Sequence, residues 1–168
     1  MKTLNLYLIT ILAVLLLSSC ARKAEEAAEY NDHIVEHQLE IIQSFDRFDS
    51  VFVDSVATKD QIEFVYVNMQ STIKSSILAL DSIGPFQKDP LLEVAARDLF
   101  KAYDQVVSNE YRQLTDIKLL PAESITTAIV DSSFSIQMRI HDVSKMAQEK
   151  FLMAQDSFGK KYNLLFEE

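Results

Sequence analysis

The chain is poor in the residues on which several common protein classes depend. Its 168 residues include two glycines, three prolines, one cysteine and no tryptophan. So few glycines and prolines argue against an all-β fold with many tight turns, and against the glycine-rich loops that bind phosphate groups. A single cysteine excludes an internal disulfide framework and a multi-cysteine metal site. At this length we expect one domain.

Positive charge is also scarce. The 16 Lys and Arg residues stand against 25 Asp and Glu residues, which gives a formal net charge of −9. Because a protein that binds the phosphates of a nucleic acid needs a basic face, this balance argues against nucleic acid as a partner. The acidic residues are spread along the chain, which is typical of a solvated surface.

The first twenty residues have the pattern of a bacterial lipoprotein signal. Lys2 is followed by an apolar run that ends at Leu17 and is too short to cross a membrane. Together with Leu17, the next residues Ser18, Ser19 and Cys20 resemble a lipobox. This resemblance implies transfer of a diacylglycerol to the Cys20 thiol, cleavage after Ser19, and acylation of the new amino group, for example with palmitate. An ordinary signal peptide that happens to contain a cysteine is the alternative.

The lipobox divides the chain into three parts. Residues 1–19 would be a cleaved signal peptide, residues 20–28 a lipidated cysteine with its tether, and residues 29–168 the folded domain. Several acyl chains attach a protein firmly to a membrane, whereas one is marginal. Ala21 follows the cysteine, and by its likeness to the sorting rule of enteric lipoproteins this favours the outer membrane. The periplasmic and the extracellular faces both stay open.

Helical signals dominate the rest of the chain from about residue 24 onwards. Capping and turn residues divide it into four segments. The boundaries are an end near Val56, a capping box at Thr58 and Gln61, a stop at Gly84 and Pro85, a cap and first helical residue at Asp89 and Pro90, and a break at Pro121.

Each segment has one apolar stripe at helical spacing. The stripes are Tyr30, Ile34, Ile41, Phe45, Phe48 and Phe52; Ile62, Tyr66, Met69, Ile73, Ile77 and Leu80; Leu92, Ala95, Leu99, Tyr103, Val106, Leu114 and Ile117; and Ile125, Ile129, Ile136, Ile140, Val143, Ala147, Phe151, Ala154, Phe158, Tyr162 and Leu165. Glu110 interrupts the third stripe. Wide stripes suit a globular bundle, and short connections make neighbouring helices antiparallel. The sequence therefore predicts an all-α fold, a single up-down-up-down antiparallel four-helix bundle.

Two histidines on the first helix are candidate metal ligands. His33, Glu36 and His37 spell His-x-x-Glu-His, which resembles the zinc motif of inverted zinc peptidases. His37 and Glu40 also form His-x-x-Glu, which is similar to the motif of imelysin-like envelope proteins, although Val35 replaces the glycine of that motif. We favour solvated or half-buried histidines beside the core and expect no metal. His33, His37 and Glu40 are the candidate ligands of the alternative.

Motifs of the enzymes built on helical bundles are missing. The sequence has no Glu-x-x-His for a di-iron site, no haem-attachment motif, no Gly-x-Ser-x-Gly and no Walker loop. We therefore expect no catalytic residue, no cofactor and no enzymatic activity.

The stretch Glu-Tyr-Asn-Asp-His-Ile-Val-Glu-His-Gln at residues 29–38, soon after the lipobox, resembles a family of small uncharacterised bacterial surface lipoproteins of the spirochaete and Bacteroidetes type. The resemblance implies a surface location and transfers no catalytic residue.

The sequence thus predicts a lipid-anchored outer-membrane or surface protein with a non-catalytic helical domain that has a binding or structural role. It would be a monomer or a homodimer, with an unidentified protein as a further partner. An envelope metal-binding protein is one alternative. The other is an envelope chaperone or assembly subunit, which would use the apolar residues Leu39, Ile42, Val51 and Val53.

Overall fold

The computed structural model describes the backbone of residues 2–164 and the side chains of residues 22–164. Helices make up 87% of the chain and no strand occurs in the described part, so the predicted all-α class is confirmed. The helices are α1 (Lys2–Val53), α2 (Lys59–Ile83), α3 (Leu91–Val106), α4 (Arg112–Lys118) and α5 (Thr127–Tyr162). A π-helical turn, Val107–Tyr111, joins α3 to α4, and a 3-10 turn, Ala122–Ser124, precedes α5.

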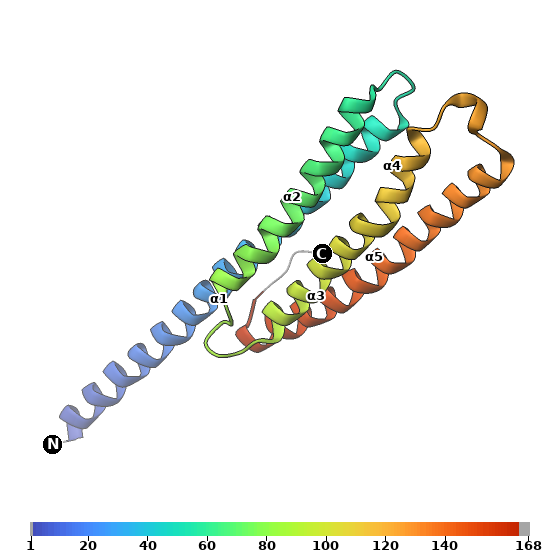
Figure 1. Ribbon diagram of the computed structural model, residues 1–168. Coiled ribbons are helices and arrows are strands. Elements are labelled where there is room, and N and C mark those ends of the chain that lie inside the picture. Colours follow the sequence, from blue (N-terminus) through green and yellow to red (C-terminus); the bar gives the residue numbers. More distant parts are fainter. Residues whose placement is uncertain (1, 165–168) are drawn as a thin grey trace.

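The helices form two closely packed pairs. In Figure 1, α2 lies along α1, and α3 with α4 lies along α5, while the N-terminal part of α1 extends beyond the other helices. The α1–α2 and α3–α5 contacts are the most extensive, and contacts between α2 and α3 join the two pairs. Contacts between α1 and α5 are far fewer. The side of the domain where α1 faces α5 is therefore the least covered.

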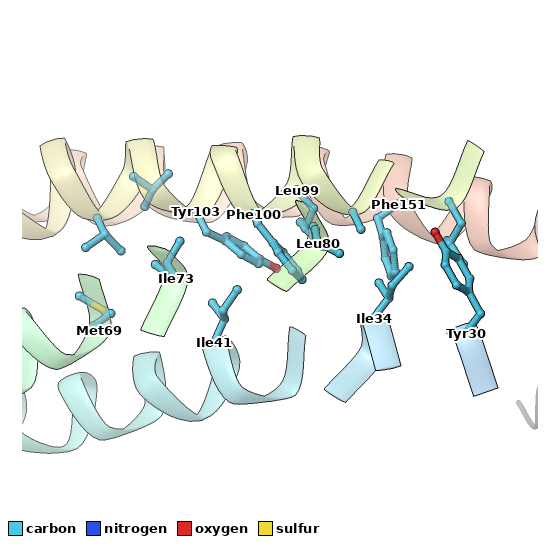
Figure 2. Close-up of a cluster of buried hydrophobic side chains, with 14 of the residues drawn as sticks. Tyr30, Ile34, Ile41, Met69, Ile73, Leu80, Leu99, Phe100, Tyr103 and Phe151 are labelled. Carbon is cyan, nitrogen blue, oxygen red and sulfur yellow. The ribbon is translucent and has the colours of Figure 1, made fainter. Parts of the chain in front are cut away.

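The core lies between the two pairs and follows the first two predicted stripes closely. Ile34, Ile41 and Ile73 are fully buried, and the aromatic residues of these stripes are buried or half-buried. Figure 2 shows Ile41 of α1 pointing toward Phe100 and Tyr103 of α3. Apolar burial of this kind is the main favourable contribution to folding.

The predicted boundaries of α2 are confirmed in detail. The Gln61 N–H donates to Thr58 Oγ1 at 3.3 Å, and the Thr58 N–H donates to Gln61 Oε1 at 2.8 Å, which is the expected capping box. Gly84 ends the helix with φ of 64°, a conformation that glycine adopts without strain.

The start of α3 lies one residue later than predicted. Pro90 was expected as the first helical residue, but it has φ −87° and ψ 0° and the helix begins at Leu91. Asp89 still acts as a cap, because its Oδ1 accepts a hydrogen bond from the Leu91 N–H at 3.1 Å.

The third predicted stripe is buried or half-buried throughout, but it omits Tyr111, which the π-helical turn brings to the core. A π turn holds one more residue than an α turn and so rotates everything that follows it. Tyr111 is buried, whereas the Glu110 side chain lies at the edge of the core, 19% exposed, with Oε1 3.7 Å from Nε of Arg139. Glu110, which interrupts the predicted stripe, therefore lies at the edge of the core and not within it.

The fourth predicted stripe is too long. It starts at Ile125, after the break at Pro121, but α5 begins at Thr127, with Thr126 as its cap. Ile125 is 42% exposed in the preceding loop and Val143 is 41% exposed, so neither belongs to the core. Leu165 lies outside the described residues. Because α5 packs mainly on α3, only a narrow face of it is covered.

Candidate functional site

One end of the domain is closed by an aromatic cluster. It joins α1, the α2–α3 loop and α5 through Tyr30, Phe86, Phe158 and Tyr162, which we call the closed cluster. The ring centroids of Phe158 and Tyr162 are 4.6 Å apart, and those of Tyr30 and Phe86 are 5.2 Å apart. The Tyr30 hydroxyl donates to the carbonyl oxygen of Gly84 at 2.8 Å. Aromatic packing and a satisfied hydroxyl fix α1 against the loop here.

Polar contacts reinforce this end. Lys161 Nζ donates to Asp89 Oδ2 at 2.7 Å, and the Tyr162 hydroxyl donates to the same oxygen at 3.3 Å. The hydrogen bond from Lys161 is the main reason that the pKa of Asp89 lies below its usual value. Nearby, Gln155 Nε2 donates to Asn31 Oδ1 at 2.8 Å, which ties α5 directly to α1.

A second aromatic cluster lies farther along α1 and is open on one side. We call Phe45, Phe48, Phe52, Tyr103 and Tyr111 the open cluster. Phe45 stacks on Tyr111 and meets Tyr103 edge-on, with ring centroids 5.3 Å apart in both pairs. Phe48 meets Tyr111 edge-on at 5.1 Å. Phe45 and Phe52 are only half-buried, so their rings have surface that no helix covers.

This uncovered surface is the floor of a cleft of about 660 Å³ between α1 and α5, the α1–α5 cleft. The two helices touch near Asn31 and Gln155 and then enclose this space. The cleft is lined by Phe45, Asp49, Phe52, Val53, Tyr103, Tyr111, Leu114, Gln137, Ile140, His141, Ser144, Lys145 and Gln148.

The π-helical turn positions part of the floor. It carries Tyr111 round to α1, where the ring packs between Phe45 and Phe48. In solved proteins, π turns of this kind occur frequently at functional sites. This turn interrupts the regular hydrogen bonds of the α-helix and directs an aromatic side chain toward a cleft. Such an arrangement is consistent with a binding site.

The floor of the cleft has a negative electrostatic environment. Burial raises the pKa of the Tyr111 hydroxyl, and the carboxylates of Asp49 and Asp46 raise it further. Partial burial, followed by the nearby Asp46, raises the pKa of Asp49, although a good part of its side chain faces solvent. The opposite wall, on α5, carries His141 and Lys145.

A second groove of about 620 Å³ lies between α3 and α5 on another face. Its edges are apolar and exposed, with Leu91, Val94 and Met146 all accessible to solvent. Its lining holds Ala95, Leu99, Ala102, Val143, Ala147 and Ala154 together with Asp98, Lys101, Gln105 and Lys150. This α3–α5 groove has no aromatic floor.

The predicted metal candidates do not converge on one site. His37 Nδ1 lies 3.1 Å from Glu40 Oε2, whereas His33 Nδ1 lies 3.9 Å from Glu36 Oε2, so each imidazole is paired with a different carboxylate. Across the described residues, no group of three or more His, Cys, Asp or Glu side chains could hold a metal ion. A structural zinc site needs four ligands and a catalytic one needs three.

Cys20, the predicted lipid attachment site, lies outside the residues whose side chains are described, so its modification stays a prediction. Where side chains are described, no helix is long and apolar enough to cross a membrane. Of the apolar residues assigned to the chaperone alternative, Leu39 and Val53 are exposed, whereas Ile42 and Val51 are half-buried.

The sequence did not identify the cleft. One signal was present, because Phe45, Phe48 and Phe52 put three phenyl rings on one face of α1 within two turns. That spacing indicated core, and only the sparse α1–α5 contact leaves two of these rings partly uncovered. His141 and Lys145 carry no motif that could have marked them.

Known proteins supply no template for interpreting this site. Its function has to be argued from the cleft and from the sequence of the N-terminal segment. No family model matches the chain, and no curated protein or solved structure is significantly similar to it.

Proposed function

We propose that this protein is a lipid-anchored protein of the bacterial outer membrane whose helical domain binds a ligand at the α1–α5 cleft and catalyses no reaction. The observation that carries the binding role is the cleft itself. Its volume of about 660 Å³ lies within the range of roughly 300–1,000 Å³ that is typical of small-molecule pockets. The anchor is supported by the lipobox-like residues that end at Cys20.

The proposed architecture is an up-down-up-down antiparallel four-helix bundle in which α3, the π turn and α4 count as one bent helix. Short connections support it, since residues 54–58, 84–90 and 119–126 join the successive long helices. Contacts between successive helices support it as well. In this arrangement the cleft lies between the first and last helices, which no loop joins directly.

The lining of the cleft favours binding over catalysis. His141, Ser144 and Asp49 all line it, and these residue types can form a nucleophilic triad. A base must lie within hydrogen-bonding reach of the group that it deprotonates. Among the described residues, none of the hydrogen bonds joins any two of these three, so the residues are not arranged as a triad in this structure.

The anchor is tested by metabolic labelling of cells with radioactive palmitate. The wild-type protein should take up label and fractionate with the outer membrane. The variant Cys20→Ala should take up no label. Because Cys20 is the chain's one cysteine, no other thiol can replace it. Equal labelling of the two proteins would refute the anchor. Protease treatment of intact cells then separates the two faces, since a surface protein is degraded and a periplasmic one is protected.

A second candidate function is that of an assembly subunit. The α3–α5 groove favours it, because Leu91, Val94 and Met146 form an exposed apolar edge beside small alanine side chains that would let another helix approach. Sedimentation of the purified protein tests this candidate. A strictly monomeric protein that does not slow the aggregation of an unfolded client would exclude it.

A further inference from the structure

The two walls of the α1–α5 cleft differ in charge. On α1, Asp49 lines the cleft and Asp46 lies close enough to raise its pKa. On α5, the lining residues with basic side chains are His141 and Lys145. An ionic ligand would therefore be oriented by the cleft, with its positive end at α1 and away from α5.

The acidic wall has no cation of its own. The charged groups that shift the pKa of the Tyr111 hydroxyl are the carboxylates of Asp49 and Asp46, and the one that shifts the pKa of Asp49 is Asp46. None of the ion pairs formed by the described residues includes Asp46 or Asp49. At the closed end of the domain, by contrast, Asp89 is paired with Lys161. The α1 wall thus has Asp49 in the cleft lining, and Asp46 one turn before it, without an ion-pair partner beside the half-buried rings of Phe45 and Phe52.

Aromatic rings in this protein attract cations where a cation is within reach. Lys118 Nζ lies 5.6 Å from the ring centroid of Phe52, and Lys23 and Lys161 lie 5.2 Å and 5.5 Å from that of Tyr162. The negative face of an aromatic ring accounts for such contacts. Among the described residues, the ring of Phe45 has no such partner, although it borders the acidic wall.

We infer that the α1–α5 cleft binds an organic cation with an aromatic or alkyl body. The ammonium group would lie beside Asp46 and Asp49, and the body would cover the half-buried rings of Phe45 and Phe52. Aromatic surface with nearby carboxylates is the combination that recognises quaternary and alkyl ammonium groups in proteins. An anion of the same shape would meet the two carboxylates instead. This inference rests on the proposed binding role of the cleft and names its ligand class.

Titration calorimetry with two water-soluble probes tests this inference. Benzyltrimethylammonium carries a permanent positive charge on an aromatic body, and 3-phenylpropanoate carries a negative charge on a similar body. The full-length protein is held in a non-ionic detergent, and protein-free micelles give the background. We expect saturable 1:1 binding of the cation and weaker binding of the anion.

Variants locate the binding. Asp49→Asn and Asp46→Asn should each weaken cation binding about twofold to fivefold, which is the usual range for an exposed charge contact. Glu29→Gln is the matched control, because Glu29 is an exposed acid on α1 at the closed end of the domain, and it should leave affinity unchanged. Lys145→Ala should leave affinity unchanged or increase it. Thermal melting by circular dichroism shows that each variant is folded.

Three results would overturn the inference: no saturable binding of the cation, equal or tighter binding of the anion, or affinity that depends on Lys145 and not on Asp46 or Asp49. Tight binding of the anion that depends on Lys145 would leave the cleft as a binding site but change its ligand class. If neither probe binds, the ligand class is refuted. The lipid anchor is unaffected by that result, because palmitate labelling tests it separately.

Discussion

Phe45 of α1 stacks on Tyr111 of the π-helical turn, with ring centroids 5.3 Å apart and an interplanar angle of 25°. This contact joins the first helix to the only described segment that departs from α-helical winding between Leu91 and Lys118. It also makes the floor of the cleft, because Phe45 and Tyr111 both line it. The stability of the domain and the shape of the proposed binding site therefore depend on the same pair of rings.

Replacing Tyr111 with alanine should destabilise the domain strongly. The ring is buried against Phe45 and Phe48, and truncating a buried aromatic side chain typically costs about 3–5 kcal/mol. Tyr111→Phe is the control. Its hydroxyl forms none of the hydrogen bonds found among the described residues, so we expect a change within about 1 kcal/mol. Urea denaturation measures both, and equal losses for the two variants would contradict the packing role.

Deleting Asn109 should be tolerated far better than deleting a residue from a straight part of the helix. A π turn contains one residue more than an α turn, so removal of the exposed Asn109 would convert it to α-helix and leave the later buried positions in phase. We expect a loss of about 1 kcal/mol. Deletion of the exposed Lys101 in α3 would instead rotate the buried residues before the turn by roughly 100°.

The comparison of the two deletion variants by urea denaturation is therefore diagnostic. The protein without Lys101 should lose about 4 kcal/mol or more, because core side chains would turn toward solvent. Similar stabilities for the two variants would contradict our interpretation of the turn as a single inserted residue.

Acid should weaken the closed end of the domain. The pKa of Asp89 is lowered in the folded state, first by the hydrogen bond from Lys161, so its carboxylate stabilises the fold at pH values above the unfolded pKa of about 3.9. This contribution is lost as the pH falls through the lower, folded pKa. Asp89→Asn should reduce stability at pH 7 and make it less sensitive to acid below about pH 4.

The measurement for Asp89 is the urea midpoint of wild type and variant at a series of pH values from neutral to strongly acid. Glu29→Gln serves as the control, because Glu29 is exposed on α1 and should leave the pH dependence unchanged. Parallel curves for wild type and Asp89→Asn would show that the contact with Lys161 contributes nothing to folding.

Alkali should act on the buried tyrosines. Burial is the main cause that raises the pKa of Tyr30 to about 12. A raised tyrosine pKa means that the neutral form stabilises the fold fully below the unfolded value of about 10, and that this contribution is lost as the pH rises through the folded value. Following tyrosinate absorbance against circular dichroism tests this. Ionisation of all tyrosines near pH 10 with the helices intact would contradict the burial of Tyr30.

Sequence reasoning succeeded where structure is decided locally. The capping box of Thr58 and Gln61 depends on residues three apart, and the first stripe depends only on helical spacing, so both could be predicted. The burial of Tyr111 could not, because a π turn leaves no reliable trace in the spacing of apolar residues. Only tertiary packing decides which side chains of the helix face the core after the turn.

The cleft was beyond sequence reasoning for a similar reason. Ile140 has the spacing of a core residue on α5, yet it is only half-buried and lines the cleft, because α5 packs mainly on α3 and touches α1 little. Which helix pairs are close and which are splayed depends on the sum of many contacts. Cys20 is the opposite case, since its predicted role depends on a local motif in a segment whose side chains are not described.

The most direct test of the account is methyl NMR of the full-length protein labelled at isoleucine and methionine, titrated with benzyltrimethylammonium. Ile140 lines the α1–α5 cleft, Met146 lines the α3–α5 groove, and Ile73 lies in the core. We predict a saturable shift of the Ile140 methyl signal with little change at Met146 and Ile73. A shift at Met146 with none at Ile140, or no saturable shift at either, would contradict the assignment of the α1–α5 cleft as the binding site.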